Sequence, residues 1–317
     1  MASAVKLGAR PSALALAQAE IVRSLLGAAA PGLAIEIVPI RTSGDRMTRA
    51  SLAQVGGKGL FIKELENALA ERRIDIAVHS MKDLPAALAR NFRIAAVPVR
   101  ENTADVLVTR DGARLTDLPS GARVGTSSPR RRFQALRINP GLAIEPLRGN
   151  VDTRIKRVEA GELGAVILAI AGLKRLNLAE RVKFEELNAV DFIPAGGQAA
   201  LAIEALAGRR ARGSAELERA LAAINDPRAF YEIAAERGFL AVIGASCTTP
   251  IGVRATVGDR ALSIRAILFS LDGAREIAES AGEPLDPDLA PSSAERAGAA
   301  LAEKMLARGA AELLSNG

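Results

Sequence analysis

The chain has 317 residues, of which 49% are hydrophobic, and it carries a formal net charge of +6. Ordinary domains hold roughly 150 residues, so this length predicts two or three domains instead of one core. The sequence has no run of about 18 apolar residues without a charge, and Glu20 interrupts the apolar stretch 13–19 before any cleavage site. We therefore expect a cytoplasmic protein without a membrane segment.

The composition also excludes several kinds of site. Cys247 and His79 are the only cysteine and the only histidine, so neither an internal disulfide nor a Cys/His metal site can form. Only 3% of the residues are aromatic, which is too few for a platform on which nucleic-acid bases stack. We expect no metal and no nucleic-acid partner. The basic residues are 34 Arg and 8 Lys, and the positions of the arginines are more informative than their number.

The N-terminal segment predicts a strand that leads into a helix. Residues 5–9 form the strand, and Ser12 and Gly27 are the expected start and stop of the helix. Arg10 then lies at the strand-to-helix turn, where helix amides attract an anion. The residues expected on the buried face of the helix are Leu14, Ala17, Ile21 and Leu25.

A second strand is expected over residues 33–40, and a glycine-rich segment follows it. The sequence QVGGKG at 54–59 is similar to a phosphate-binding loop, but Leu52 replaces the first glycine and Gly59 replaces the required Ser or Thr. We reject a phosphate loop and expect a loop that carries Lys58. The next helix should bury Phe61, Leu65 and Leu69.

Residues 73–85, RIDIAVHSMKDLP, predict a strand that ends in a polar turn. The apolar alternation typical of a strand begins at Ile74 and stops at Ser80, and Pro85 disfavours a helical conformation of the residue before it. Two interpretations remain: a solvated turn, or a ligand site at the carboxyl end of a strand in an open α/β sheet. The polar residues concerned are His79, Ser80, Lys82 and Asp83.

The middle of the chain repeats the alternation of strand and helix. Strands are expected at 92–99, 104–110 and 122–125, and the link 100–103 is a candidate crossing between domains. The last of these strands precedes a helix with Ser128 as its N-cap. The helix dipole disfavours cations in a first turn by roughly 0.3–1 kcal/mol each, so arginines there indicate either an anionic ligand or a solvated basic helix end. These arginines are Arg130, Arg131 and Arg132.

Arginines recur at the strand-to-helix turns that follow. Arg148 comes after the strand 142–147, the next helix carries Arg154, and Arg175 comes after the strand 165–169. Strands and helices that alternate in this way predict parallel βαβ units. Guanidinium groups at such turns would line a cleft between two domains and pair with carboxylates or phosphates.

The last third of the chain predicts a small α+β domain. A second crossing at 193–198 and a returning strand at 201–203 precede it. Cys247 lies in the loop GASCTTPIG, where it is either a small buried hydrophobic residue or an exposed nucleophile. Helices are expected at 214–224 and 227–237, strands at 251–257, 261–270 and 274–277, and a helix from Ser292 that is capped with the help of Glu295.

Seven motifs, in this order, resemble those of the porphobilinogen deaminases, also called hydroxymethylbilane synthases. The resemblance implies three domains, namely two α/β domains like type II periplasmic binding proteins with a cleft between them and a small α+β domain that carries the cofactor cysteine. The expected bounds are 1–99 with 197–217, then 100–196, then 218–317. The motifs are GARPS at 8–12, VGGKGLF at 55–61, DIAVHSMKD at 75–83, GTSSPRR at 125–131, LRGN at 147–150, LAIAGLKRL at 168–176 and CTTPIG at 247–252.

The resemblance also implies an enzyme, a monomeric transferase of tetrapyrrole biosynthesis, the route to haem and chlorophyll. Four porphobilinogen molecules would be deaminated and joined head to tail on a dipyrromethane cofactor, and hydrolysis would release the linear tetrapyrrole. A thioether to Cys247 would hold the cofactor.

The same resemblance assigns roles to individual residues. Asp83 would be the catalytic residue, because its carboxylate stabilises positive charge on pyrrole nitrogens and takes part in proton transfer. Apart from the resemblance, we expect His79 to be a structural residue, because it lies at the end of the strand. Contacts with the cofactor are implied for Lys82, Asp83, Thr126, Ser128, Arg130, Arg131 and Arg154. Contacts with the substrate are implied for Arg10, Ser12, Arg148, Arg154 and Arg175, with Lys58 on a lid loop.

A protein of another class, a binding module without catalysis, would also have two cleft-forming domains and basic turns. Examples are a periplasmic solute receptor and the effector domain of a regulator. The sequence disfavours both. It shows neither a leader nor a recognisable DNA-reading helical domain, and it has a third domain with a loop cysteine.

Overall fold

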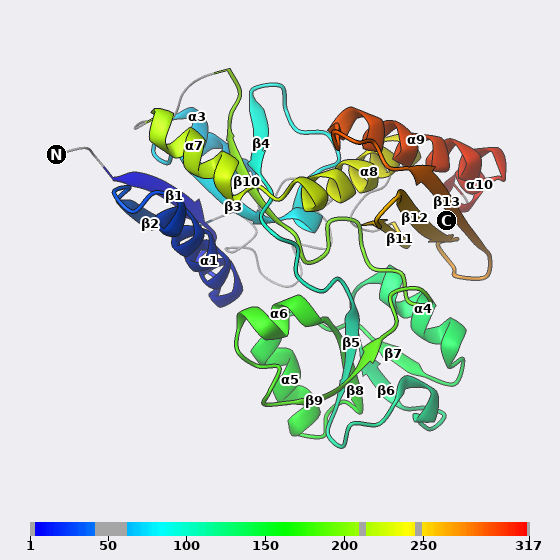
Figure 1. Cartoon of the computed structure of the whole chain (residues 1–317). Coiled ribbons are helices and arrows are strands. Elements are labelled where there is room, and N and C mark those ends of the chain that lie inside the picture. The colour runs from blue at the N-terminus through cyan, green and yellow to red at the C-terminus, as the bar shows by residue number, and fades with distance from the viewer. Residues whose placement is uncertain (1–3, 42–61, 209–213, 245–248, 316–317) are drawn as a thin grey trace. The chain divides into compact units, whose positions relative to one another are not determined.

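The computed structural model describes residues 4–41, 62–208, 214–244 and 249–315. The chain forms two compact units (Figure 1). The first unit comprises Met1–Arg100 with Ala200–Phe230, and the second comprises Glu101–Ala199 with Tyr231–Gly317. The chain therefore passes between the units three times, at 100/101, 199/200 and 230/231. The first passage falls within the predicted crossing 100–103 and the second beside the predicted crossing 193–198. The third falls in a segment for which the sequence predicted a helix and no crossing.

The first unit is built on a five-stranded sheet in the order β2-β1-β3-β10-β4. The first three strands are parallel, and β10 runs antiparallel to both of its neighbours. The carboxyl ends of β1 and β3 therefore lie side by side at one edge of the sheet. The strands are β1 (Val5–Ala9), β2 (Ile35–Pro39), β3 (Ile76–Ser80), β4 (Phe92–Ala96) and β10 (Leu201–Leu206).

Helices cover both faces of this sheet. Alternate residues of β3 enter different clusters, since Ile76 packs with α1 and α7 whereas Ala77 packs with α3. The helices are α1 (Ala13–Ala29), α3 (Lys63–Ala70) and α7 (Ser214–Ile224), and a 3₁₀ turn, Met81–Asp83, follows β3. The predicted boundary between 217 and 218 falls inside α7, which packs into the core of the first unit through Leu217, Ala220 and Leu221.

The structure corrects the prediction for α1 in two respects. The helix continues past Gly27 to Ala29, and its buried face differs from the expected one. Ile21 and Leu25 are each 37% exposed. The segment is rich in alanine, so small apolar residues extend around most of the helix and the pattern did not identify the stripe that meets the sheet. The residues that are buried are Gln18, Ala19, Val22 and Leu26.

The second unit contains another five-stranded sheet, in the order β7-β6-β8-β5-β9. Here β6 is parallel to β7 and β8, whereas β5 is antiparallel to β8 and β9. The two sheets therefore have the same arrangement. The strands are β5 (Asp105–Thr109), β6 (Arg123–Gly125), β7 (Ala143–Glu145), β8 (Ala165–Ala169) and β9 (Lys183–Leu187). The helices are α4 (Pro129–Ile138), α5 (Val151–Glu159) and α6 (Ile170–Arg175), and a 3₁₀ turn spans Leu115–Asp117.

The second unit also holds a small α+β region. Its strands β11 (Ile251–Val257), β12 (Ala261–Phe269) and β13 (Glu276–Pro284) form an antiparallel sheet. The helices are α8 (Pro227–Ile243), whose first turn belongs to the first unit, α9 (Pro291–Ala307) and α10 (Ala310–Ser315).

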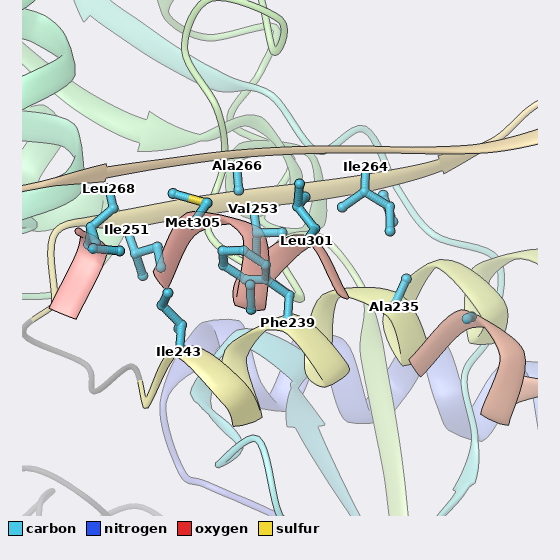
Figure 2. Packing of buried hydrophobic residues seen from close by; sticks show 14 of the residues in the cluster. Ala235, Phe239, Ile243, Ile251, Val253, Ile264, Ala266, Leu268, Leu301 and Met305 are labelled. Atoms are coloured by element: carbon cyan, nitrogen blue, oxygen red, sulfur yellow. The ribbon is translucent and has the colours of Figure 1, made fainter. Parts of the chain in front are cut away.

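Side chains of α8, β11, β12 and α9 meet in the core of this region (Figure 2). Glycine allows α8 and α9 to approach closely, because a Cβ added at Gly298 would lie 1.9 Å from the Ala235 carbonyl oxygen. A Cβ at Gly238 would likewise lie 2.3 Å from the Glu295 carbonyl oxygen. The two glycines thus fix the spacing between these helices.

Two further predictions for this region are wrong. The third strand is Glu276–Pro284 and extends well beyond the predicted 274–277, because its pairing with β12 continues past the apolar residues. The last long helix begins at Pro291 with Ala290 at the N-cap, and no side chain caps it. The nearby Ser293 hydroxyl instead contacts the Ala290 carbonyl and the Tyr231 hydroxyl.

The fold class is the predicted one, with two α/β sheets of equal strand order and a small α+β region. The edge strand β9 was missed, since its sequence KFEEL is too polar to indicate a strand. Within the described ranges, no helix is both long and apolar enough to span a membrane.

Candidate functional site

A pocket lies in the first unit at the edge where β1 and β3 end. The sequence predicted that the turns after these strands carry polar side chains, and the parallel pairing of β1 with β3 brings the turns together. The side chains of Arg10 and Ser12 after β1 and of Asp83 after β3 line this one pocket. The other polar residues in its lining are Gln18, His79 and Ser80.

The backbone holds Asp83 in a 3₁₀ turn directly after β3. Met81 is buried, its amide donates to the Ala200 carbonyl at 3.0 Å, and the Leu84 amide donates back to the Met81 carbonyl at 3.1 Å. Lys82 and Asp83 are exposed. The predicted turn is confirmed, and it presents a carboxylate on a fixed piece of backbone.

The Ser12 hydroxyl caps α1, as predicted, by accepting a hydrogen bond from the Ala15 amide at 3.3 Å. Gln18, one turn further along the helix, donates from Nε2 to the Ser80 hydroxyl at 2.9 Å. This bond ties α1 to the end of β3. The pocket wall is therefore braced on the side that carries Arg10.

His79 forms a buried pair with a residue that the sequence analysis missed. Its Nε2 lies 2.9 Å from Oε2 of Glu204 on β10, and both side chains are almost inaccessible. Burial, and then the charge of Glu204, raise the pKa of the nearby Glu66 carboxyl. An acidic residue in the otherwise apolar strand LAIEAL was the available signal for a buried polar partner.

The second unit gathers its predicted residues at the corresponding edge of its own sheet. Thr126 and Ser128 follow β6, Arg148 and Arg154 follow β7, and Arg175 ends the helix after β8. These three strands are parallel neighbours, so their carboxyl ends meet. Ser128 caps α4 by accepting from the Arg131 amide at 3.4 Å, which confirms the predicted cap.

Arg130 and Arg131 contact an internal carboxylate, that of Asp105. Arg130 Nη1 lies 2.7 Å from Asp105 Oδ2, and Arg131 Nη2 lies 2.7 Å from Asp105 Oδ1. All three side chains are buried. Burial alone would raise the pKa of Asp105, but the charges of the two arginines outweigh it and hold this pKa well below its ordinary value. The partner expected from the sequence was a ligand or solvent, and Asp105 was not identified.

Arg154 and Arg175 are partly buried cations. Burial, and then the charge of Arg131, lower the pKa of Arg154, whose Nε donates to the Gly149 carbonyl at 2.8 Å. Burial lowers the pKa of Arg175 to about 10, and its Nη2 donates to the Ala199 carbonyl. Arg148 is exposed. A carboxylate or phosphate ligand would stabilise the neighbouring cations Arg131 and Arg154.

We expect Asp105→Asn to lower the free energy of unfolding at pH 7 by about 3–5 kcal/mol, because it leaves two buried arginines without their counter-charge. The pKa of Asp105 is depressed on folding, so its stabilisation is full above the unfolded pKa of about 3.9 and is lost as pH falls towards the folded value. Urea unfolding at pH 7 and at pH 3 should therefore show a smaller difference between wild type and variant at pH 3. Equal stability at pH 7 would contradict this.

Cys247 and Lys58 lie outside the described residues, as does Phe61. In the parts of the chain that are described, no group of three or more His, Cys, Asp or Glu side chains could hold a metal ion. The structure thus places the predicted residues in two sets. Arg10, Ser12, Lys82 and Asp83 belong to the first unit, and Thr126, Ser128, Arg130, Arg131, Arg148, Arg154 and Arg175 belong to the second.

Two family profiles match this chain. Residues 5–212 match the dipyrromethane cofactor binding domain of porphobilinogen deaminase, and residues 230–307 match the C-terminal domain of the same enzyme. The chain belongs to the porphobilinogen deaminase family. It is 42% identical over 313 residues to a porphobilinogen deaminase of Syntrophotalea carbinolica, covering 99% of this chain and 96% of that protein. It is 45% identical over 311 residues to that of Moorella thermoacetica, covering 98% and 95%.

Solved structures with some likeness to this chain include substrate-binding proteins of transporters. One is the second substrate binding domain of a putative amino acid ABC transporter from Streptococcus pneumoniae, with 13% identity and a TM-score of 0.42. That comparison covers 70% of this chain and 93% of the other.

Proposed function

We propose that this chain is a hydroxymethylbilane synthase. It deaminates porphobilinogen, joins four molecules head to tail on a covalently bound dipyrromethane and releases the linear tetrapyrrole by hydrolysis. The observation that carries the proposal is the position of the Asp83 carboxylate in a pocket that also contains Arg10. A fixed carboxylate next to a cation suits a substrate that carries its own carboxylates and develops positive charge as it reacts.

Asp83 is the catalytic residue of the proposal. Loss of ammonia from the aminomethyl group leaves positive charge on the pyrrole, and a carboxylate beside the ring nitrogen lowers the energy of that state. The same carboxylate accepts and returns a proton as the new carbon-carbon bond forms. The 3₁₀ turn supports this role because it holds the carboxylate before substrate arrives.

Arg10 and Ser12 hold substrate carboxylates in the first unit. Both lie at the amino end of α1, where backbone amides add to the attraction for an anion. Porphobilinogen carries an acetate and a propionate group, which match a guanidinium and a hydroxyl. Lys82 contributes a further charge on the Asp83 turn, and we also assign Lys58 to the binding of substrate.

The side chains of the second unit fit a dipyrromethane. Arg154 and Arg131 are close enough for the charge of one to affect the other, and burial depresses the pKa of Arg154, so a ligand carboxylate would stabilise both. The other residues that we assign to the cofactor are Thr126, Ser128 and Arg130. We assign Arg148 and Arg175 to the binding of substrate. When bound through Cys247, the group supplies the pyrrole carbon from which the chain grows. We also propose that the protein is a cytoplasmic monomer that binds neither nucleic acid nor membrane.

The first test is an assay of ammonia and tetrapyrrole release from porphobilinogen in the presence of a metal chelator. We expect turnover without added metal or nucleotide, since the chain offers no Cys/His ligand set and no phosphate loop. Activity that chelation abolishes and a single metal restores would contradict the proposal. Binding of porphobilinogen without any turnover would favour the alternative of a binding module.

Replacement of the arginines should interrupt elongation at different stages. Arg148→Leu and Arg154→Leu each remove a charge-assisted contact worth roughly 1.5–3 kcal/mol, which slows the affected addition about tenfold or more. Intact mass after a short exposure to porphobilinogen should show accumulated partial products. Arg157→Leu is the matched control. Arg157 lies on α5 as Arg154 does, but its guanidinium group forms an ion pair with Glu162. Wild-type kinetics in both variants would refute the carboxylate-binding roles.

A further inference from the structure

Asp105 occupies an unusual position for a wholly buried carboxylate. It is the first residue of β5, and the antiparallel register pairs it with Ala169, the last residue of β8. Asp105 therefore lies at the edge of the sheet where the arginines of the second unit gather. A carboxylate at this position meets the same guanidinium groups that a ligand carboxylate would need.

The contacts of Asp105 set the orientation of Arg131. Asp105 Oδ1 accepts from Arg131 Nε at 3.0 Å and from Nη2 at 2.7 Å, and the third nitrogen, Nη1, donates to the Ile167 carbonyl at 3.0 Å. Each guanidinium nitrogen thus has a fixed acceptor, and the plane of the group cannot rotate. The Arg131 side chain keeps 9% of its surface accessible, and these contacts use only three of its five N–H bonds.

Asp105 compensates only part of the charge around it. Arg130 binds Oδ2, and Arg131 binds Oδ1, so one negative charge faces two positive charges. Arg154 adds a third cation, whose pKa is lowered by burial and then by the charge of Arg131. The cluster therefore keeps a net positive charge and can bind an anion, and the contacts of Arg131 already fix its orientation.

We propose that Asp105 is a positioning residue, which presents Arg131 in a fixed orientation to carboxylates of the growing pyrrole chain. The inference rests on the function proposed above and adds to it a residue outside the motifs. Asp105 does not touch the reacting atoms. It acts through Arg131, and an addition that needs Arg131 should fail in the same way when either residue is changed.

A purely structural role is the competing interpretation, because the same cluster also braces the segment after β9. Arg130 Nη1 donates to the Ile193 carbonyl at 2.8 Å, and Gln198 Nε2 donates to Asp105 Oδ1 at 3.0 Å. Gln134 braces the same segment without touching Asp105: the Ile193 amide donates to its Oε1 at 2.7 Å, and its Nε2 donates at 3.0 Å to the Ile193 carbonyl, which it shares with Arg130. Gln134→Met removes that brace, nearly preserves volume and leaves the Asp105 contacts intact, so it is a matched control.

The experiment compares Asp105→Asn, Arg131→Leu, the double variant and Gln134→Met in the full chain. Each is exposed briefly to porphobilinogen, quenched and denatured, and intact mass gives the fraction of protein at each stage from the unmodified chain onward. Melting temperature is measured in parallel. We expect Asp105→Asn and Arg131→Leu to accumulate at the same stage, at least about tenfold slower than wild type, with the double variant no slower than Arg131→Leu. Gln134→Met should have a lower melting temperature than wild type but the same fraction of protein at each elongation stage.

Two results would overturn the inference. One is an Asp105→Asn variant that melts earlier but elongates like wild type, and the other is a double variant whose defect is the product of the two single defects. If Asp105→Asn does not fold, Arg130→Met and Arg130→Met/Asp105→Asn replace it, because removing one buried cation offsets the lost carboxylate. The inference then predicts that Arg130→Met and the double variant accumulate at different elongation stages. The same fraction of protein at each stage in both variants would refute it. A wild type that carries no adduct and leaves porphobilinogen unchanged would refute the proposed function itself.

Discussion

Asp83→Asn is expected to lose nearly all turnover of porphobilinogen while keeping the fold. The amide preserves the shape of the side chain but removes the negative charge and the site that accepts a proton. Proton transfer by a positioned group contributes about 10²- to 10⁴-fold, and electrostatic stabilisation adds to that. Asp83 is exposed in its turn and does not belong to a core cluster, so the substitution should not unfold the protein. Steady-state ammonia release measures the effect.

Two control variants separate charge from packing at this position. Asp83→Glu keeps the carboxylate and should retain more activity than Asp83→Asn. Asp75→Asn makes the same chemical change on the residue before β3. The Asp75 carboxylate accepts a hydrogen bond from the Lys6 amide at 2.8 Å and does not line the pocket. It should leave turnover close to wild type. Substantial turnover by Asp83→Asn would remove Asp83 from the catalytic role.

Cys247→Ser is expected to give a largely inactive protein without a covalent cofactor. Serine nearly preserves the size of the side chain, but its hydroxyl is far less nucleophilic than a thiolate, so the thioether cannot form. The protein should still fold, because the packed core of the C-terminal region comes from α8, α9 and the strands of its sheet. Circular dichroism tests the fold, and a porphobilinogen assay tests the activity. Wild-type activity in this variant would exclude a cofactor bound at Cys247.

The sequence predicted the parts of the site that depend on local pattern. Arg10 and Asp83 each follow an apolar strand, and parallel pairing then brings strand ends to one edge. Ser12 and Ser128 precede helical periodicity and cap their helices as expected. These predictions succeeded because each needs only a few consecutive residues and one general property of α/β sheets.

The buried counter-charges could not be predicted in the same way. Glu204 is 125 residues from His79, and Asp105 is 26 residues from Arg131. Each pair exists because an antiparallel strand lies between or beside the parallel ones, and no local pattern encodes that strand order or its register. Glu204 does interrupt an otherwise apolar strand, and Asp105 begins one. A buried acid without a local partner indicates a distant cation or histidine, but it does not say which one.

The most direct test of the proposed function is the intact mass of the purified, denatured wild-type protein. A thioether survives unfolding, whereas a ligand held only by arginines would dissociate. We expect a single species heavier than the 317-residue sequence by a dipyrromethane, with the added mass on the peptide that contains Cys247. An unmodified mass in protein that actively converts porphobilinogen would contradict the covalent cofactor and the proposed function built on it.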